Sequence, residues 1–284
     1  MDVGQIRDAA IASQFASREA LDGWLARAIG EHRHLLYRAL WHARQAAIRC
    51  PLQGEAYLFL GELVFLEGKD HSTKSQLIQQ ALRVRPYDGK VLLMAGKEAA
   101  IAGDVQAAVD YWRQSFKQSI DGKYDLIQLL SQRVPAELTI EILEPKAADI
   151  AIFCRAYQRL ADPQKTKFVC DHFHQLLLRE KGQSASRAVH WTTLSRAYSN
   201  INRVNDAVWC AEQGLKCDPN HFDSHLLLGS LLVKSGVFSA AEQHLRWCVL
   251  RRPEHPQTRK YLEEAVKGKV AKHRQKSNGA VIRQ

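Results

Sequence analysis

Two pairs of metal-binding residue types lie four residues apart, the spacing that places side chains on one face of a helix. Cys170 pairs with His174, and His221 pairs with His225. Thiolate sulfur and imidazole nitrogen both bind zinc, but a tight zinc site needs three or four such ligands. Each pair supplies two, so packed or hydrogen-bonded side chains explain both pairs better. We therefore predict no metal site.

A second group of residues has some likeness to a phosphate-binding loop. Gly61 and Gly68 are followed by Lys69, but six residues separate the glycines where four are needed. Asp70 also stands where a serine or threonine would reach the metal ion. A packing role for Gly61 accounts for the pattern, so no nucleotide or other cofactor is expected.

Neighbouring glutamates could form an acid–base pair, which requires a desolvated cleft that separates two carboxyl pKa values. Glu141 with Glu144, and Glu263 with Glu264, have the spacing of solvated helix faces instead. The sequence also has neither Gly-x-Ser-x-Gly nor Gly-x-Gly-x-x-Gly. We predict that the protein is not an enzyme.

The net charge of +10 is concentrated at the end of the chain. From residue 267 onward there are six Lys or Arg residues and no acid, which leaves +4 for the 266 residues before them. A nucleic-acid-binding body would need a basic face, and this body is close to balanced. The six cysteines form no Cys-x-x-Cys motif and favour reduced thiols, as in a reducing compartment: Cys50, Cys154, Cys170, Cys210, Cys217 and Cys248.

The length of 284 residues suits two domains or one longer array, and the hydrophobic fraction of 46% is that of a folding chain. No apolar run reaches the roughly 18 residues of a membrane-spanning helix. The first residues, Met1 to Asp8, have neither the basic nor the apolar part of a leader peptide. A cytoplasmic location is expected.

An internal period of 34 residues decides the fold class. It relates Leu194 to Leu228, and Pro219 to Pro253. The same offset relates Ser195 to Gly229 and Ala207 to Ala241. This pattern resembles the tetratricopeptide repeat (TPR), a helix-turn-helix unit in which small residues let the two helices approach and a proline ends the second helix. The resemblance implies an all-α, right-handed α-solenoid of TPR-type helix-turn-helix repeats with a C-terminal capping helix.

The same template fits the N-terminal third, with Leu60-Gly61 and Pro86 in one unit and Ala95-Gly96 in the next. The middle keeps helical apolar spacing but loses the pattern. The predicted divisions are an N-terminal extension or helix, TPR-like repeats, irregular helical hairpins, C-terminal repeats with a capping helix, and a basic disordered tail: 1–19, 20–120, 121–187, 188–272 and 273–284.

TPR arrays bind partners in a groove lined by first helices, through repeat positions 2, 5, 9, 12 and 13, as the resemblance implies. Members that clamp a peptide C-terminus place Lys and Asn at positions 5 and 9 of the leading repeat, whereas Leu58 and Glu62 stand there in this chain. The candidate groove residues for a protein or peptide partner are Leu58, Glu62, Phe65, Leu93, Lys97, Thr192, Arg196, Asn200, Leu226, Ser230 and Lys234. Arg196, Asn200 and Lys234 could hold an acidic peptide or a sugar acid, or could be a solvated groove wall.

Two functional hypotheses follow. The first is a non-enzymatic TPR scaffold that mediates protein–protein interaction. The second rests on residues about 40–145, where stretches such as Cys50 to Leu60 and Gln80 to Gly89 resemble the soluble TPR tail of bacterial O-antigen ligase-like membrane proteins. That resemblance implies an accessory or tail region of a polysaccharide-assembly system.

The basic end supports a further expectation. Cations near a helix C-terminus complement its dipole, and the same charges could make a weak contact with an anionic surface. The residues concerned are Lys267, Lys269, Lys272, Arg274 and Lys276.

Overall fold

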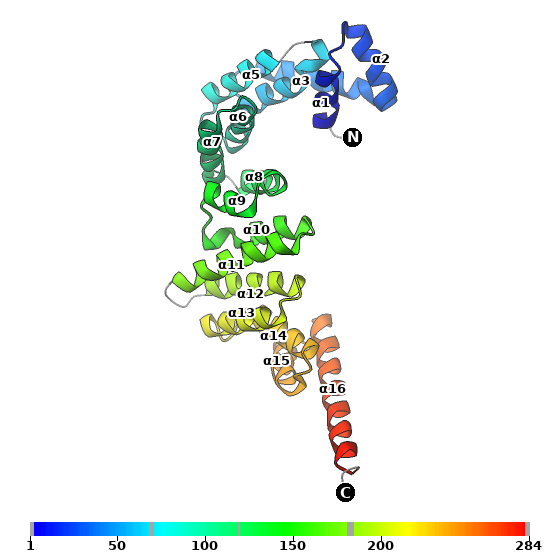
Figure 1. Cartoon of the computed structure of the whole chain (residues 1–284), viewed down its shortest axis with the longest axis vertical. Helices are drawn as coiled ribbons and strands as arrows, with labels where there is room; N and C mark the ends of the chain where they lie inside the picture. Colours follow the sequence, from blue (N-terminus) through cyan, green and yellow to red (C-terminus); the bar gives the residue numbers. More distant parts are fainter. Residues whose placement is uncertain (1–2, 69–70, 119, 181–184, 282–284) are drawn as a thin grey trace. The chain divides into compact units, whose positions relative to one another are not determined.

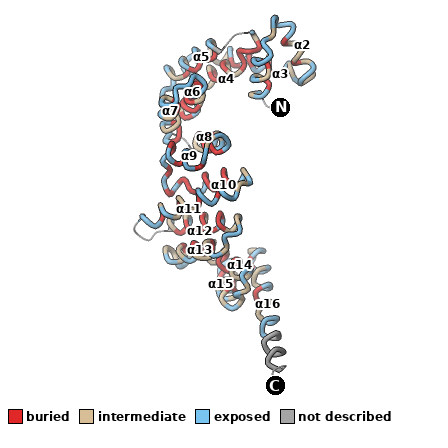
Figure 2. The backbone as a smooth tube through the Cα atoms, in the orientation of Figure 1, coloured by how far each residue is buried: buried red, intermediate tan, exposed pale blue. Residues whose placement is uncertain are grey.

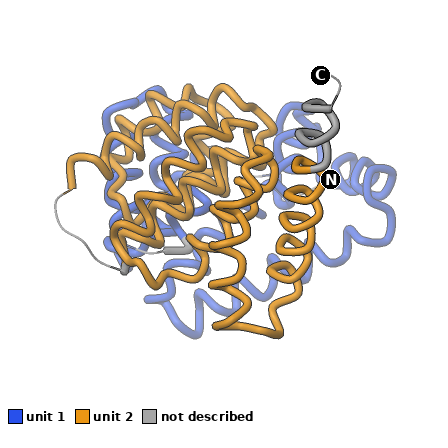
Figure 3. Tube along the Cα trace, turned by 90° about the horizontal axis from the view of Figure 1, so that it is seen from below, with its two compact units in different colours: residues 1–126 blue, residues 127–284 orange. Residues whose placement is uncertain are grey.

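The computed structural model describes residues 3–68, 71–118, 120–180 and 185–281, and over these residues it is built of α-helices and short 3-10 turns with no strand (Figure 1). The all-α class expected from the sequence is confirmed. The chain divides into two compact units, residues 1–126 and 127–284, which Figure 3 shows in different colours. Each unit is described by itself.

Unit 1 begins with three helices and continues as two helical hairpins. Its elements are α1 (Val3–Ala12), α2 (Arg18–Ile29), η1 (Gly30–His32), α3 (Arg33–Arg49), α4 (Gly54–Leu63), η2 (Val64–Glu67), α5 (His71–Val84), α6 (Gly89–Ile101) and α7 (Val105–Gln118). The helix α8 (Ile120–Arg133) contains the division between the units. Helix α4 packs against α5 and α6 against α7, and α6 also contacts α4.

Unit 2 continues with irregular helices and then regular hairpins. Its elements are α9 (Ala136–Leu143), η3 (Ala147–Asp149), α10 (Ile150–Arg159), α11 (Pro163–Arg179), α12 (Ala185–Asn200), α13 (Val204–Cys217), α14 (Phe222–Lys234), α15 (Phe238–Arg251) and α16 (Pro256–Val281). The hairpins are α12 with α13 and α14 with α15, and α16 packs on both α14 and α15. Helix α16 therefore covers the last hairpin, and it continues into the range 273–284 that the sequence assigns to a tail.

Small residues bring the two helices of each hairpin together, as the 34-residue period predicts. Ser195 Oγ donates a hydrogen bond of 2.6 Å to the carbonyl oxygen of Ala207, which ties α12 to α13. Gly96 lies against the ring of Trp112, where a β-carbon would stand 2.3 Å from the indole nitrogen. These close approaches are the packing of a TPR-type helix-turn-helix repeat.

Burial follows the hairpins within each unit (Figure 2). One core cluster joins α4, α5 and α6 through Leu58, Ile78, Ala81, Val91 and Ala95. Another joins α14, α15 and α16 and includes Leu226, Leu245 and Ala265. Since each cluster takes side chains from three consecutive helices, a hairpin is stabilised by the helix that follows it.

Local residue chemistry explains where several helices begin. Asp162 caps α11 by accepting hydrogen bonds from the backbone amides of Gln164 and Lys165, at 3.0 and 3.1 Å, and Pro163 is the first helical residue. Asp88 caps α6 in the same way. Pro135 occupies the N-cap position of α9, so the helix begins at the next residue, Ala136.

Candidate peptide-binding surface

More than half of the candidate groove residues are buried. In unit 1, Leu58, Phe65 and Leu93 are only 8%, 5% and 6% exposed. In unit 2 the buried candidates are Thr192, Leu226 and Ser230. These side chains therefore take part in the packing of helices, as Phe65 does beside Ile6 and Ala10 of α1 and Leu58 does beside Ile78 and Ala81 of α5. Their role in binding a partner stays a prediction.

Candidates with accessible side chains remain in both units. Glu62 and Lys97 are half-buried on α4 and α6. Arg196, Asn200 and Lys234 are exposed on α12 and α14, which contact each other directly. The three polar residues that the sequence associated with an acidic partner thus lie on two helices that are in contact.

A buried hydrogen-bond cluster fixes α12 against α14 below this surface. The Thr192 hydroxyl donates to the carbonyl oxygen of Ala188 at 2.7 Å, and its oxygen lies 2.6 Å from Ser224 Oγ. With the Thr192 hydrogen used, Ser224 donates to Thr192, and the Nδ1–H of His221 donates to Ser224 at 2.9 Å. The helices are therefore held at a defined spacing, which is what a binding surface needs.

The exposed part of the surface is held more loosely. Arg196 Nη2 and Asp223 Oδ2 lie 3.6 Å apart, and the two side chains are 56% and 49% exposed. Such an exposed pair contributes about 0–1 kcal/mol of stability. Arg196 can therefore exchange Asp223 for a carboxylate of a partner at little cost.

Helix α16 adds residues to this face that are absent from the predicted groove positions. Adding 34 to Leu226, Ser230 and Val233 gives Lys260, Glu264 and Lys267, and all three are exposed on α16, which packs on α14. The 34-residue period alone is enough to predict these three positions.

The side chains of the two pairs, Cys170 with His174 and His221 with His225, make packing contacts and hydrogen bonds within unit 2. His174 stacks on Trp209 with ring centroids 4.7 Å apart, whereas Cys170 is fully buried beside Cys154. His225 donates from Nε2 to the carbonyl oxygen of Pro219 at 3.0 Å. Among the residues that the structure describes, no group of three or more His, Cys, Asp or Glu side chains is arranged to hold a metal ion.

His225 contacts His244 on the neighbouring helix α15. His225 Nδ1 lies 2.9 Å from His244 Nδ1, and the ring of His225 stacks on Trp247 at 3.8 Å. Because Nε2 of neutral His225 already carries its hydrogen, Nδ1 accepts and His244 donates. Burial lowers the pKa of both histidines, and Arg251 lowers that of His225 further.

The cysteines are all free thiols. Burial raises the pKa of Cys248 to about 12, and hydrogen bonding to Cys170 together with burial raises that of Cys154. Such thiols are unreactive because little thiolate forms near neutral pH. The candidate glutamates Glu141, Glu144, Glu263 and Glu264 are exposed, as solvated helix faces are.

Two of the basic residues near the C-terminus have partners within the chain. Lys269 Nζ lies 2.8 Å from Glu242 Oε2, and Lys272 Nζ donates to the carbonyl oxygen of Gly236 at 3.1 Å. Lys267 is exposed. The side chains of Arg274 and Lys276 lie outside the described residues. Lys269 and Lys272 thus attach α16 to the last hairpin.

Within the described part of the chain, no helix combines the length and apolar character needed to cross a bilayer. The cytoplasmic location stays a prediction.

No family model matches the chain. Similar solved structures include the APC/C hetero-tetramer Cut9-Hcn1, with 14% identity and a TM-score of 0.42 over 81% of this chain. That match covers 46% of the other protein, so this chain spans less than half of its length. YrrB, described as a TPR protein with an unusual peptide-binding site, matches at 11% identity and a TM-score of 0.37, over 76% of this chain and 95% of YrrB.

The TPR2AB domain of yeast Sti1, solved as a complex with pHSP90, matches at 14% identity and a TM-score of 0.35, over 93% of this chain and 99% of that one. The resemblance of residues 40–145 to O-antigen ligase-like tails finds no support among these structures. Function is therefore inferred from the residues of the chain itself.

Proposed function

We propose that this protein is a non-enzymatic scaffold that binds an acidic peptide segment of a partner protein on the face formed by α12, α14 and α16. The observation that carries the proposal is the exposed Arg196–Asp223 pair above the buried Thr192–Ser224 contact. A rigid base with exchangeable polar groups favours recognition of a carboxylate, because the helices are already in place when the partner arrives.

Each residue has a distinct part in this proposal. Arg196 offers a planar guanidinium for bidentate contact with a carboxylate. Asn200 lies one helical turn further along α12 and offers both a donor and an acceptor for the peptide backbone. Lys234, exposed on the neighbouring α14, supplies a second cation for an acidic side chain.

The test is fluorescence anisotropy with labelled ten-residue peptides, acidic and basic, added to the full chain. Arg196→Glu and Lys234→Glu should each weaken binding of the acidic peptides about tenfold or more, the loss expected for a charged hydrogen bond. Lys216→Glu is the matched control, because Lys216 is also exposed but lies on the second helix α13. Equal binding of acidic and basic peptides, or equal loss in the control, would refute the proposal.

A further inference from the structure

The N-terminal helix α1 covers part of the face that the repeat pattern assigns to a partner. Helix α1 contacts α4 and η2. Ile6 and Ala10 belong to the same core cluster as Phe65 and Leu66, which stand at repeat positions 12 and 13. Phe65 was predicted to line the groove, and it is buried because α1 and its neighbours lie over it.

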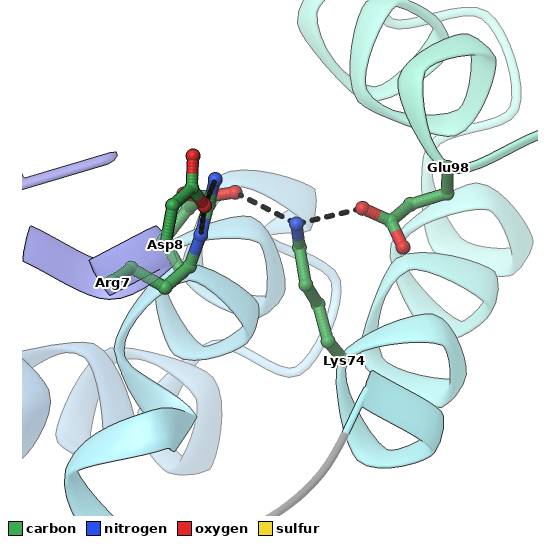
Figure 4. A network of polar contacts seen from close by, with 5 residues as sticks. Arg7, Asp8, Lys74 and Glu98 are labelled. Carbon is green, nitrogen blue, oxygen red and sulfur yellow. Dashed lines mark hydrogen bonds and ion pairs between the residues drawn. The ribbon is translucent and has the colours of Figure 1, made fainter. Parts of the chain in front are cut away.

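Charge complementarity accompanies this apolar contact. Arg7 Nη1 donates to Glu62 Oε2, and Glu62 stands at groove position 9. The other oxygen of Glu62 lies 3.4 Å from Lys74 Nζ, and Lys74 Nζ lies 2.7 Å from Glu98 Oε1. Figure 4 shows Lys74 reaching toward the carboxylate of Glu98, with Arg7 of α1 on its other side. Arg7 thus brings a second cation from α1 to a pair of carboxylates on α4 and α6.

The hold of α1 on this face is limited. Of its residues only Ile6 and Ala10 are buried, whereas Val3 and Ile11 are 41% and 48% exposed. Arg7 divides its guanidinium between Glu62 and its neighbour Asp8. Since an isolated helix of ten residues is marginal in water, α1 depends on these few contacts for its order.

We propose that the surface of α4 and η2 beneath α1 is a second binding surface, and that α1 is its intramolecular occupant. The partner that fits is a short amphipathic helix that presents an aliphatic side chain in place of Ile6 and an arginine in place of Arg7. Binding of this partner displaces α1. The inference concerns unit 1 alone and does not rest on the role proposed for Arg196 and Lys234.

The probe is a labelled peptide of residues 3–14 that carries Gly4→Ala. The substitution gives the peptide a different mass from the same segment of the chain, so the two can be told apart. Ile6→Asp in the full chain removes the apolar anchor and frees the surface. Val3→Asp places the same charge on the exposed side of α1 and is the control. The peptide should bind the Ile6→Asp chain about tenfold or more tightly than the wild-type or Val3→Asp chain, since α1 no longer competes. A peptide that also carries Arg7→Glu should bind the Ile6→Asp chain about tenfold more weakly.

Hydrogen exchange on the wild-type chain gives a readout that does not depend on a variant. Saturating peptide should speed exchange of the α1 amides and slow exchange of the η2 amides. The proposal is overturned if the peptide binds all three chains equally, if it fails to bind the folded Ile6→Asp chain, or if α1 exchange is unchanged. Should Ile6→Asp lose its helical circular dichroism, the exchange result on the wild-type chain decides.

Discussion

Gly229 on α14 lies so close to Leu245 on α15 that a β-carbon added to the glycine would stand 2.7 Å from the leucine Cγ. Leu245 is fully buried in the cluster that also holds Phe222 and Ala265, so it has no free space to move into. The sequence predicted that Gly229 and Ala241 meet in this hairpin. Ala241 is buried there, but the atoms that bar a side chain at Gly229 are those of Leu245, one turn further along α15.

Gly229→Arg should therefore lower the free energy of unfolding by several kcal/mol, about 3 or more, because overpacking adds to a buried charge. Urea denaturation measures the loss. Gly23→Ala is the matched control, since a β-carbon at Gly23 in the middle of α2 meets only the end of Arg27 at 3.9 Å. That change should stabilise the chain by about 0.5–1 kcal/mol through helix propensity. If Gly229→Arg unfolded at the same urea concentration as the wild type, the close packing of Gly229 against Leu245 would be contradicted.

Lys74 offers a test of the ion network in unit 1. Its side chain is 8% exposed, and it lies between Glu62 and Glu98. Lys74→Met leaves two carboxylates without this cation and should cost about 3–5 kcal/mol at pH 7. Lys90→Met, which removes an exposed pair with Glu55 at 2.8 Å, should cost less than about 1 kcal/mol.

Most of the fold could be predicted because it repeats. The 34-residue period relates Ser195 to Gly229 and Ala207 to Ala241, and each of these residues packs inside its hairpin. Local residue chemistry also accounts for some helix boundaries, as with Asp162 and Pro163 at the start of α11.

The candidate surface was predicted less well because burial depends on contacts between distant segments. Glu62 is a groove position within its repeat, but its ion pair with Arg7 joins residues 55 positions apart. Helix α1 has only two buried residues, so no periodic pattern indicated where it packs. Likewise, the basic residues of α16 gave no sign that Lys269 would pair with Glu242 on the preceding helix.

The contact between His225 and His244 makes stability depend on pH. Burial lowers the pKa of both in the folded chain. A histidine with a lowered folded pKa takes up protons more readily when unfolded, so its contribution is complete above the unfolded pKa of about 6.5 and is lost as pH falls through that value. His172, His174 and His190 have lowered pKa values for the same reason and act in the same direction.

Urea denaturation at pH 7.5 and pH 5 should therefore show lower stability at the lower pH. Replacing both residues, His225→Gln with His244→Gln, should reduce the difference between the two pH values. Replacing exposed His32 by Gln is the control and should leave it unchanged. An undiminished difference in the double variant would assign the pH dependence to the other three histidines.

The basic residues of α16 can be divided by the partners they have. Lys269 lies beside Glu242, whose pKa is lowered by hydrogen bonds from Lys269 and Arg246, and Lys272 donates to Gly236 in the turn before α15. Lys267 is exposed on the same helix. If these lysines serve to attach α16 to the last hairpin, Lys269→Gln and Lys272→Gln should destabilise the chain more than Lys267→Gln does, by tenths of a kcal/mol up to about 1 kcal/mol each.

Contact with an anionic surface follows a different rule, because there each exposed cation contributes to a similar degree. Retention on phosphatidylserine vesicles at low salt would then fall as much with Lys267→Gln as with the other two. Stability and retention measured on the same three variants thus separate the two roles, and equal stability of all three would exclude attachment as the function of Lys269 and Lys272.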